Sequence, residues 1–77
     1  MTPSAAKLRA AADVCEERYM MPAWLALTLS GCDKSSDEWK LMNRYFGLSW
    51  EPTIAPFAQA HLRHAAHAAE RIMEAQR

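Results

Sequence analysis

Hydrophobic residues recur along most of this chain at the three- and four-residue steps that place side chains on one face of a helix. In a first segment, residues 4–20, the repeating positions are Leu8, Ala12, Cys15 and Tyr19. A second segment, residues 22–30, is apolar on nearly every side and begins with a proline, which suits the first turn of a helix. We therefore expect an amphipathic helix, followed by a short helix that lies centrally beneath the other elements.

A third helix is predicted after a polar turn. Ser35 and Glu38 have the three-residue spacing of a capping box, in which each side chain satisfies a backbone amide of the first turn. Gly47 followed by Leu48 is typical of a glycine that ends a helix, with the apolar neighbour folding back onto it. Together these signals bound a helix over residues 36–46.

The last third of the chain predicts one long, alanine-rich helix over residues 54–76, capped by Thr53. No run alternates between apolar and polar residues as a strand does. The expected fold is all-α, a small four-helix domain over residues 1–77 with a long C-terminal helix. Because a helix of about 22 residues extends about 33 Å, we expect its end either to project from the core or to pack on another chain.

Composition narrows the classes of function. Of the 77 residues 51% are hydrophobic, with three Trp and five Met, which is too apolar for a disordered segment. Nine Lys and Arg residues balance nine Asp and Glu residues, so the clustered positive charge of a nucleic-acid-binding protein is not visible. The longest apolar run, residues 20–29, has about half the length needed to span a membrane, and no secretory signal is evident. We expect a cytoplasmic protein that does not bind a membrane.

Residues capable of chemistry are present, but they form no motif. His61, His64 and His67 follow one another at three-residue steps, yet they fan over about 120° of a helix, so only two can face one ion. Cys15 lies on an apolar stripe, where a thiol stays protonated, and Cys32 is expected to be a second buried thiol. No GxSxG motif or phosphate-binding loop occurs. We therefore predict no enzymatic activity, no catalytic residues, no metal and no cofactor.

Two sets of residues are candidates for binding. Aromatic residues and arginine are enriched in protein interfaces, which predicts a protein interface at Arg44, Tyr45, Phe46 and Trp50. The alternative is that the last two of these simply cover the core. In the long helix, small apolar residues would let a second helix approach closely, which predicts a dimer helix at His61, Ala65, Ala68, Ala69 and Ile72. We expect a homodimer formed through this helix.

The functional hypothesis is a non-enzymatic protein-binding module that occludes the surface of another protein. Small regulators and inhibitors encoded by bacteria, phages or plasmids are the class analogy. The alternative is a small dimeric DNA-binding transcriptional regulator of helix-turn-helix type, with residues 37–46 in the major groove and contacts from Lys40, Asn43 and Arg44. Asp37 and Glu38 would then face phosphates, so nucleic acid is the less favoured partner.

Overall fold

Four α-helices follow one another in the computed structural model, which describes residues 2–76. They are α1 (Ala5–Glu17), α2 (Ala23–Leu29), α3 (Asp37–Phe46) and α4 (Phe57–Ala75), with a short 3-10 helix, η1 (Leu48–Trp50), between α3 and α4. The described residues contain no strand, so the all-α fold with a long C-terminal helix is confirmed. Each helix was predicted one to three residues too long at each end, except that the end of the third helix was predicted correctly.

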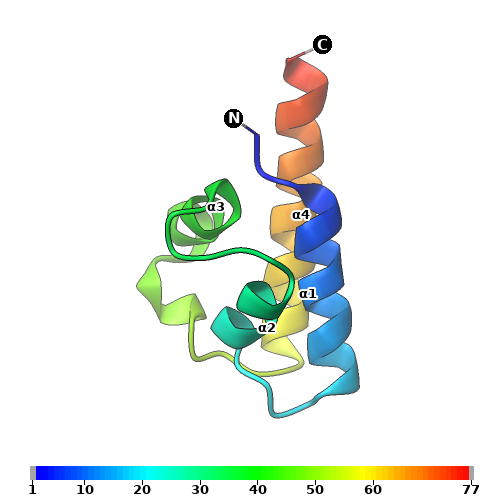
Figure 1. Ribbon diagram of the computed structural model, residues 1–77, viewed down its shortest axis with the longest axis vertical. Coiled ribbons are helices and arrows are strands. Elements are labelled where there is room, and N and C mark those ends of the chain that lie inside the picture. The colour runs from blue at the N-terminus through cyan, green and yellow to red at the C-terminus, as the bar shows by residue number, and fades with distance from the viewer. Residues whose placement is uncertain (1, 77) are drawn as a thin grey trace.

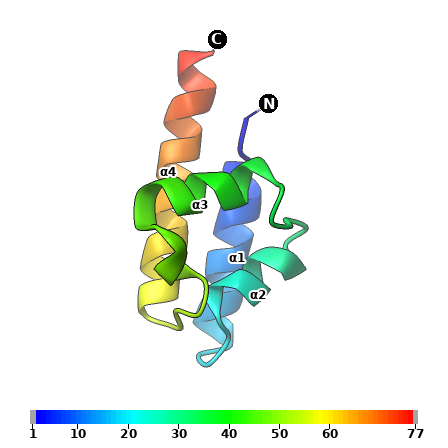
Figure 2. The ribbon, with the colours of Figure 1, turned by 90° about the vertical axis from the view of Figure 1, so that its left-hand side faces the viewer.

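Helices α1 and α4 lie side by side in opposite directions, and α2 and α3 cover one side of this pair (Figures 1 and 2). Small side chains occupy the middle of both long helices. Ala11 and Ala12 of α1 and Ala65 and Ala69 of α4 are all fully buried. Because alanine adds little bulk beyond the backbone, these positions allow two helices to pack closely. The alanine face of α4 is therefore part of the core of this chain.

The helix caps differ in part from the prediction. Ser4 caps α1, since its hydroxyl accepts a hydrogen bond from the Lys7 amide at 3.2 Å. In α3 the cap is Ser36, whose hydroxyl accepts from the Trp39 amide at 3.2 Å. The predicted capping box is wrong because Ser35 bonds to Asp33 instead, at 2.6 Å between Oγ and Oδ1.

The predicted cap of the last helix is also wrong. Helix α4 begins at Phe57, directly after Pro56, and no side chain caps it. The hydroxyl of Thr53 instead donates to the carbonyl of Ser49, at 3.2 Å. The hydroxyl of Thr53 is therefore used within the connector between η1 and α4, and the first amides of α4 receive no side-chain cap.

Helix α2 lies at the side of the fold and not at its centre. Ala23, Ala26 and Leu27 are fully buried, whereas Trp24 is 42% exposed and Leu29 is 63% exposed. The prediction of a central α2 was wrong because α1 and α4 form the middle of the core between them. Only one face of α2 is left to be covered.

The C-terminal end of α4 extends past the other helices (Figure 1). The last fully buried residue of α4 is Ala69, and the following two turns are mostly exposed. Of the two outcomes expected for this long helix, projection beyond the core is the one seen in the single chain. No described helix is both long and apolar enough to cross a lipid bilayer.

Candidate functional site

The predicted interface is divided by Gly47, where the chain turns with a φ of 67°. After this turn η1 carries Trp50 back into the core, where it is 1% exposed. Its Nε1 donates to Oδ1 of Asn43 at 2.7 Å, and its ring packs edge-on against Trp39 with 5.0 Å between ring centres. Trp50 is therefore not an interface residue, which corrects that prediction, and Leu48 is 73% exposed instead of folding back.

Four rings from α3 and α4 meet where the two helices cross. Phe46 stacks on His61, with 4.2 Å between ring centres and 23° between ring planes. Tyr45 packs edge-on against His64 at 5.5 Å, and Phe46 lies 5.9 Å from the same imidazole. We call Tyr45, Phe46, His61 and His64 the aromatic-histidine cluster. It joins the predicted interface residues of α3 to the histidines of α4, which the sequence did not connect.

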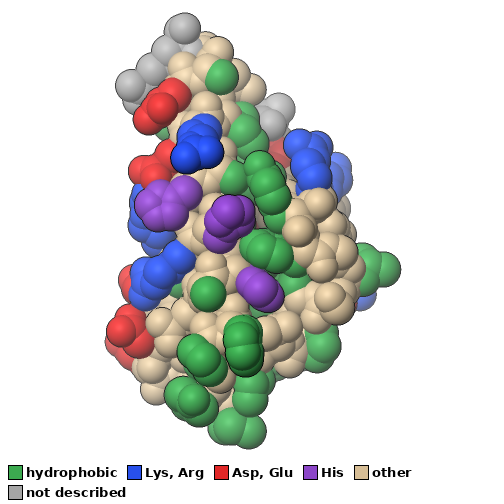
Figure 3. Space-filling view, turned by 180° about the vertical axis from the view of Figure 1, so that it is seen from behind, with side chains coloured by type: hydrophobic (Ala, Val, Ile, Leu, Met, Phe, Trp, Pro, Cys, Tyr) green, Lys and Arg blue, Asp and Glu red, His purple; other side chains and the backbone are tan. Residues whose placement is uncertain are grey.

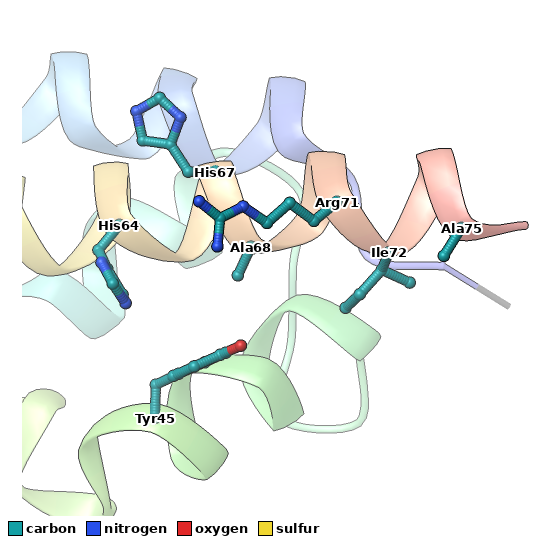
Figure 4. Close-up of a pocket in the computed structure, with 7 residues that line it drawn as sticks. All are labelled: Tyr45, His64, His67, Ala68, Arg71, Ile72 and Ala75. Atoms are coloured by element: carbon teal, nitrogen blue, oxygen red, sulfur yellow. The ribbon is translucent and has the colours of Figure 1, made fainter.

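A groove runs beside this cluster, between α3 and the C-terminal half of α4. It has a volume of about 600 Å³ and is lined by Tyr45, His64, His67, Ala68, Arg71, Ile72 and Ala75 (Figure 4). Five of these residues are exposed, whereas Ala68 and Ile72 are partly buried against the core. Tyr45 extends from α3 toward α4, while His67 points away from α3 (Figure 4). We call this feature the α3–α4 groove.

A second hollow adjoins the α3–α4 groove at Ile72. It has a volume of about 180 Å³ and is lined by Pro3, Asp37, Lys40, Leu41, Arg44 and Ile72. Since Ile72 lines both hollows, they lie on either side of one apolar side chain. Arg44, the remaining member of the predicted interface, is exposed here.

The cations near the groove lack the ion pairs that Arg9 of α1 and Arg63 of α4 form. Arg63 pairs with Asp13 at 3.2 Å and with Glu16 at 3.1 Å, and Arg9 pairs with Glu70. The hydrogen bond from Arg9 lowers the pKa of Glu70 below its ordinary value. By contrast, Lys40, Arg44 and Arg71 form no ion pair within residues 2–76. Figure 3 shows the histidines beside a band of hydrophobic side chains, with acidic and basic side chains along the left edge and further Lys and Arg side chains at the upper right.

The five residues predicted for a dimer helix do not form one surface. Ala65 and Ala69 are buried in the chain's own core, so in this fold they are not available to a second helix. His61 belongs to the aromatic-histidine cluster, and only Ala68 and Ile72 face the α3–α4 groove. The homodimer stays a prediction, and those last two residues are the part of its proposed surface that a second chain could reach.

The two cysteines are buried, and the pKa of each thiol is raised. Burial raises the pKa of the Cys15 thiol, and burial together with the charge of Glu38 raises the pKa of Cys32 to about 11. Both thiols are buried, as predicted. A protonated thiol is a poor nucleophile and a poor metal ligand. Across residues 2–76 no group of three or more histidine, cysteine or carboxylate side chains could hold a metal ion.

Glu38 is a buried carboxylate with a structural role. Its Oε2 accepts a hydrogen bond from the Ser4 amide, and its Oε1 lies 3.4 Å from the Cys32 thiol, which donates to it. Burial alone would raise the pKa of Glu38, but these hydrogen bonds and the nearby Lys7 outweigh it and leave the pKa below its ordinary value. The carboxylate therefore ties the start of α1 to the first turn of α3.

The DNA-binding alternative loses one of its three expected contacts. The side-chain carbonyl of Asn43 accepts the hydrogen bond from Trp50, and Asn43 itself is only partly exposed. Lys40 and Arg44 remain exposed, next to Asp37. Two cations beside a carboxylate make a weak surface for phosphate.

Sequence reasoning missed Arg71, His67 and Ala75 as residues of the site. With His64 they follow helical steps of three and four residues, so they share one side of α4 with Ala68 and Ile72. That spacing was visible in the sequence. What the sequence lacked was the position of α3, which turns this side of α4 into the wall of a groove.

Comparison with family models, with curated proteins and with solved structures finds no match to this chain.

Proposed function

We propose that this protein is a non-enzymatic binding module that holds another protein at the α3–α4 groove. The observation that carries the proposal is the position of Tyr45. Tyr45 is 49% exposed and lines the groove, and its ring packs against Phe46 and, edge-on, against His64. Tyrosine held in this way offers a large contact area and loses little conformational freedom on binding, which is typical of interface hot spots.

The openness of the groove favours a protein over a small molecule. Sites for small ligands bury most of the ligand surface, whereas five of the seven residues that line this groove are themselves exposed. A shallow groove between two helices is suited to the side chains of another protein, because the rest of that protein then shields them from water. Occlusion of the partner's surface in this way is the action expected of a small regulator or inhibitor.

A matched pair of tyrosine variants tests this proposal. Tyr45 and Tyr19 are both exposed, at 49% and 61%, but only Tyr45 lines the groove. Tagged wild-type protein, Tyr45→Ser and Tyr19→Ser are used to capture proteins from the source cells, followed by quantitative mass spectrometry. We expect a partner that wild type and Tyr19→Ser retain and that Tyr45→Ser loses at least fivefold. Equal retention by both variants would contradict a binding site at the groove.

A further inference from the structure

We infer that the α3–α4 groove takes an acidic amphipathic segment of its partner. An apolar side chain of that segment would lie against Tyr45, Ala68 and Ile72, and its carboxylates would face Arg44 and Arg71. This inference depends on the proposed function, because it names the chemical class of the partner at the same groove.

The two helix faces that border the groove and the adjoining hollow carry more basic than acidic side chains. The α4 face contains one cation, two histidines and no acidic residue: His64, His67, Ala68, Arg71, Ile72 and Ala75. The α3 face contains two cations and one acidic residue: Asp37, Lys40, Leu41, Arg44 and Tyr45. The chain as a whole has a net charge of zero with histidine neutral. The groove is therefore a basic region on a neutral molecule.

The two arginines beside the groove, Arg44 and Arg71, are exposed and available to a partner. The ion pairs of the described residues join Arg9 to Glu70 and Arg63 to Asp13 and Glu16. Glu70 also lies 3.5 Å from the imidazole of His67, which lines the groove. Within the same residues Arg44 and Arg71 have no carboxylate partner. A partner's carboxylates would thus form new ion pairs without breaking existing ones. Complementary charge of this kind selects partners and speeds association more than it adds affinity.

The apolar lining of the groove favours a protein over a nucleic acid as the partner. Apolar side chains line the groove beside its cations, and Ile72 lines both the groove and the adjoining hollow. A phosphate backbone gains little from such a surface, because its affinity comes mainly from neutralised phosphates. An acidic amphipathic segment matches both the apolar lining and the cations, because its apolar side chains enter the groove while its carboxylates meet the arginines at the rim.

Three synthetic peptides test the inference. The first is a 16-residue helix with leucine at three- and four-residue steps and with glutamate and alanine elsewhere. The second has lysine for every glutamate, and the third has glutamine for every leucine. Each is labelled and titrated with the full chain by fluorescence anisotropy at low salt. We expect the acidic leucine peptide to bind at least tenfold more tightly than either control, a factor that corresponds to about 1.4 kcal/mol.

Variants that reverse the charge of the arginines then test where the acidic peptide binds. Arg44→Glu combined with Arg71→Glu is expected to weaken the acidic peptide about tenfold, since two attractive rim pairs become repulsive. The matched control is Arg18→Glu combined with Lys34→Glu, which changes the net charge equally at exposed positions outside both hollows. The control should change affinity less than twofold. Equal loss in both double variants would overturn the inference, because it would show a general effect of net charge.

The remaining outcomes separate the inference from the proposed function. Equal binding of acidic and basic peptides, weakened by Tyr45→Ser, would support an apolar docking groove but overturn the acidic partner. Absence of binding by all three peptides would overturn the acidic segment, whereas the tyrosine capture experiment would still decide the proposed function. Displacement of the acidic peptide by a short DNA duplex would point to nucleic acid instead. A dimer by light scattering that Arg44→Glu and Arg71→Glu dissociate would mean that a second copy covers the groove.

Discussion

The ring of Phe46 lies nearly flat against the imidazole of His61, with 4.2 Å between their centres. Phe46 is the last residue of α3, and His61 lies in the second turn of α4, so this contact fixes the distance between the two helices at one end. Tyr45, the neighbour of Phe46, is held over the α3–α4 groove by the same arrangement. The shape of the groove should therefore depend on this pair.

A double-mutant cycle measures that dependence. Phe46→Leu and His61→Ala should each lower the free energy of unfolding, and the two together should lose less than the sum of the single losses. We expect a coupling of about 0.5–1.5 kcal/mol, the range for stacked aromatic pairs. The free energies come from urea titration followed by circular dichroism. A coupling close to zero would show that the two rings do not stabilise each other.

The close packing of α1 and α4 predicts different responses at two alanines of α4. Ala65 is fully buried, whereas Ala60 is exposed on the same helix. Ala65→Leu should cost about 1–3 kcal/mol because the core has no room for the added carbons. Ala60→Leu should stay within about 0.5 kcal/mol of wild type. Thermal unfolding distinguishes them, since about 1 kcal/mol shifts the melting temperature of a domain this small by about 4–8 °C. Similar melting temperatures for the two variants would contradict a core at Ala65.

The buried carboxylate of Glu38 should make the free energy of unfolding depend on pH. Its folded-state pKa lies below the usual value of 4.5, so the ionised carboxylate stabilises the fold above that pH. This stabilisation is lost as the pH falls through the lower, folded-state pKa. Glu38→Gln should cost about 1–3 kcal/mol at pH 7, because it removes a charged acceptor from the Ser4 amide.

The comparison that tests Glu38 is the change in unfolding free energy between pH 7 and pH 3. We expect a smaller change in Glu38→Gln than in wild type. Glu17→Gln serves as the control, because Glu17 is exposed and ends α1 on the solvent side. If Glu38→Gln and Glu17→Gln both keep the wild-type dependence, Glu38 does not supply the acid-sensitive contact.

The two cysteines should be inert in the folded protein. Both are buried, and the pKa of each thiol is raised, to about 11 for Cys32. At pH 8 an aromatic disulfide reagent should therefore react with neither thiol in the native state and with both in denaturant. Rapid reaction of one thiol in native protein would show that its helix is not packed as described.

The helices were predictable because their signals are local. The spacing of Leu8, Ala12 and Cys15 identified the buried side of α1, and Gly47 marked the end of α3. Tyr19, the fourth residue of that pattern, lies beyond the end of α1 and is 61% exposed. The errors came from residues whose partners are distant in the sequence. Glu38 was assigned to a capping box with Ser35, but it bonds to Ser4, 34 positions away. Local spacing cannot show such a bond.

The candidate site was predictable only in part for the same reason. Arg44, Tyr45 and Phe46 were identified by their residue types, and Ala68 and Ile72 by helical spacing. Their meeting across α3 and α4 depends on the path of the connecting chain, which also buries Trp50. Similarly, the alanines of α4 indicated a close helix contact. In the structure α4 makes such a contact with α1 of the same chain, and Ala65 and Ala69 are buried.

Nuclear magnetic resonance can locate the binding surface residue by residue. Uniformly ¹⁵N-labelled protein is titrated with the acidic leucine peptide, and the amide shifts are followed at a constant pH. We predict that the largest changes fall on Tyr45, His64, Ala68, Arg71 and Ile72, with little change at Tyr19 and Met20 in the α1–α2 turn. A Kd of about 1 mM corresponds to a binding free energy of about −4 kcal/mol. Shifts concentrated at that turn, or no shifts at a peptide concentration of 1 mM, would contradict binding of an acidic segment in the α3–α4 groove.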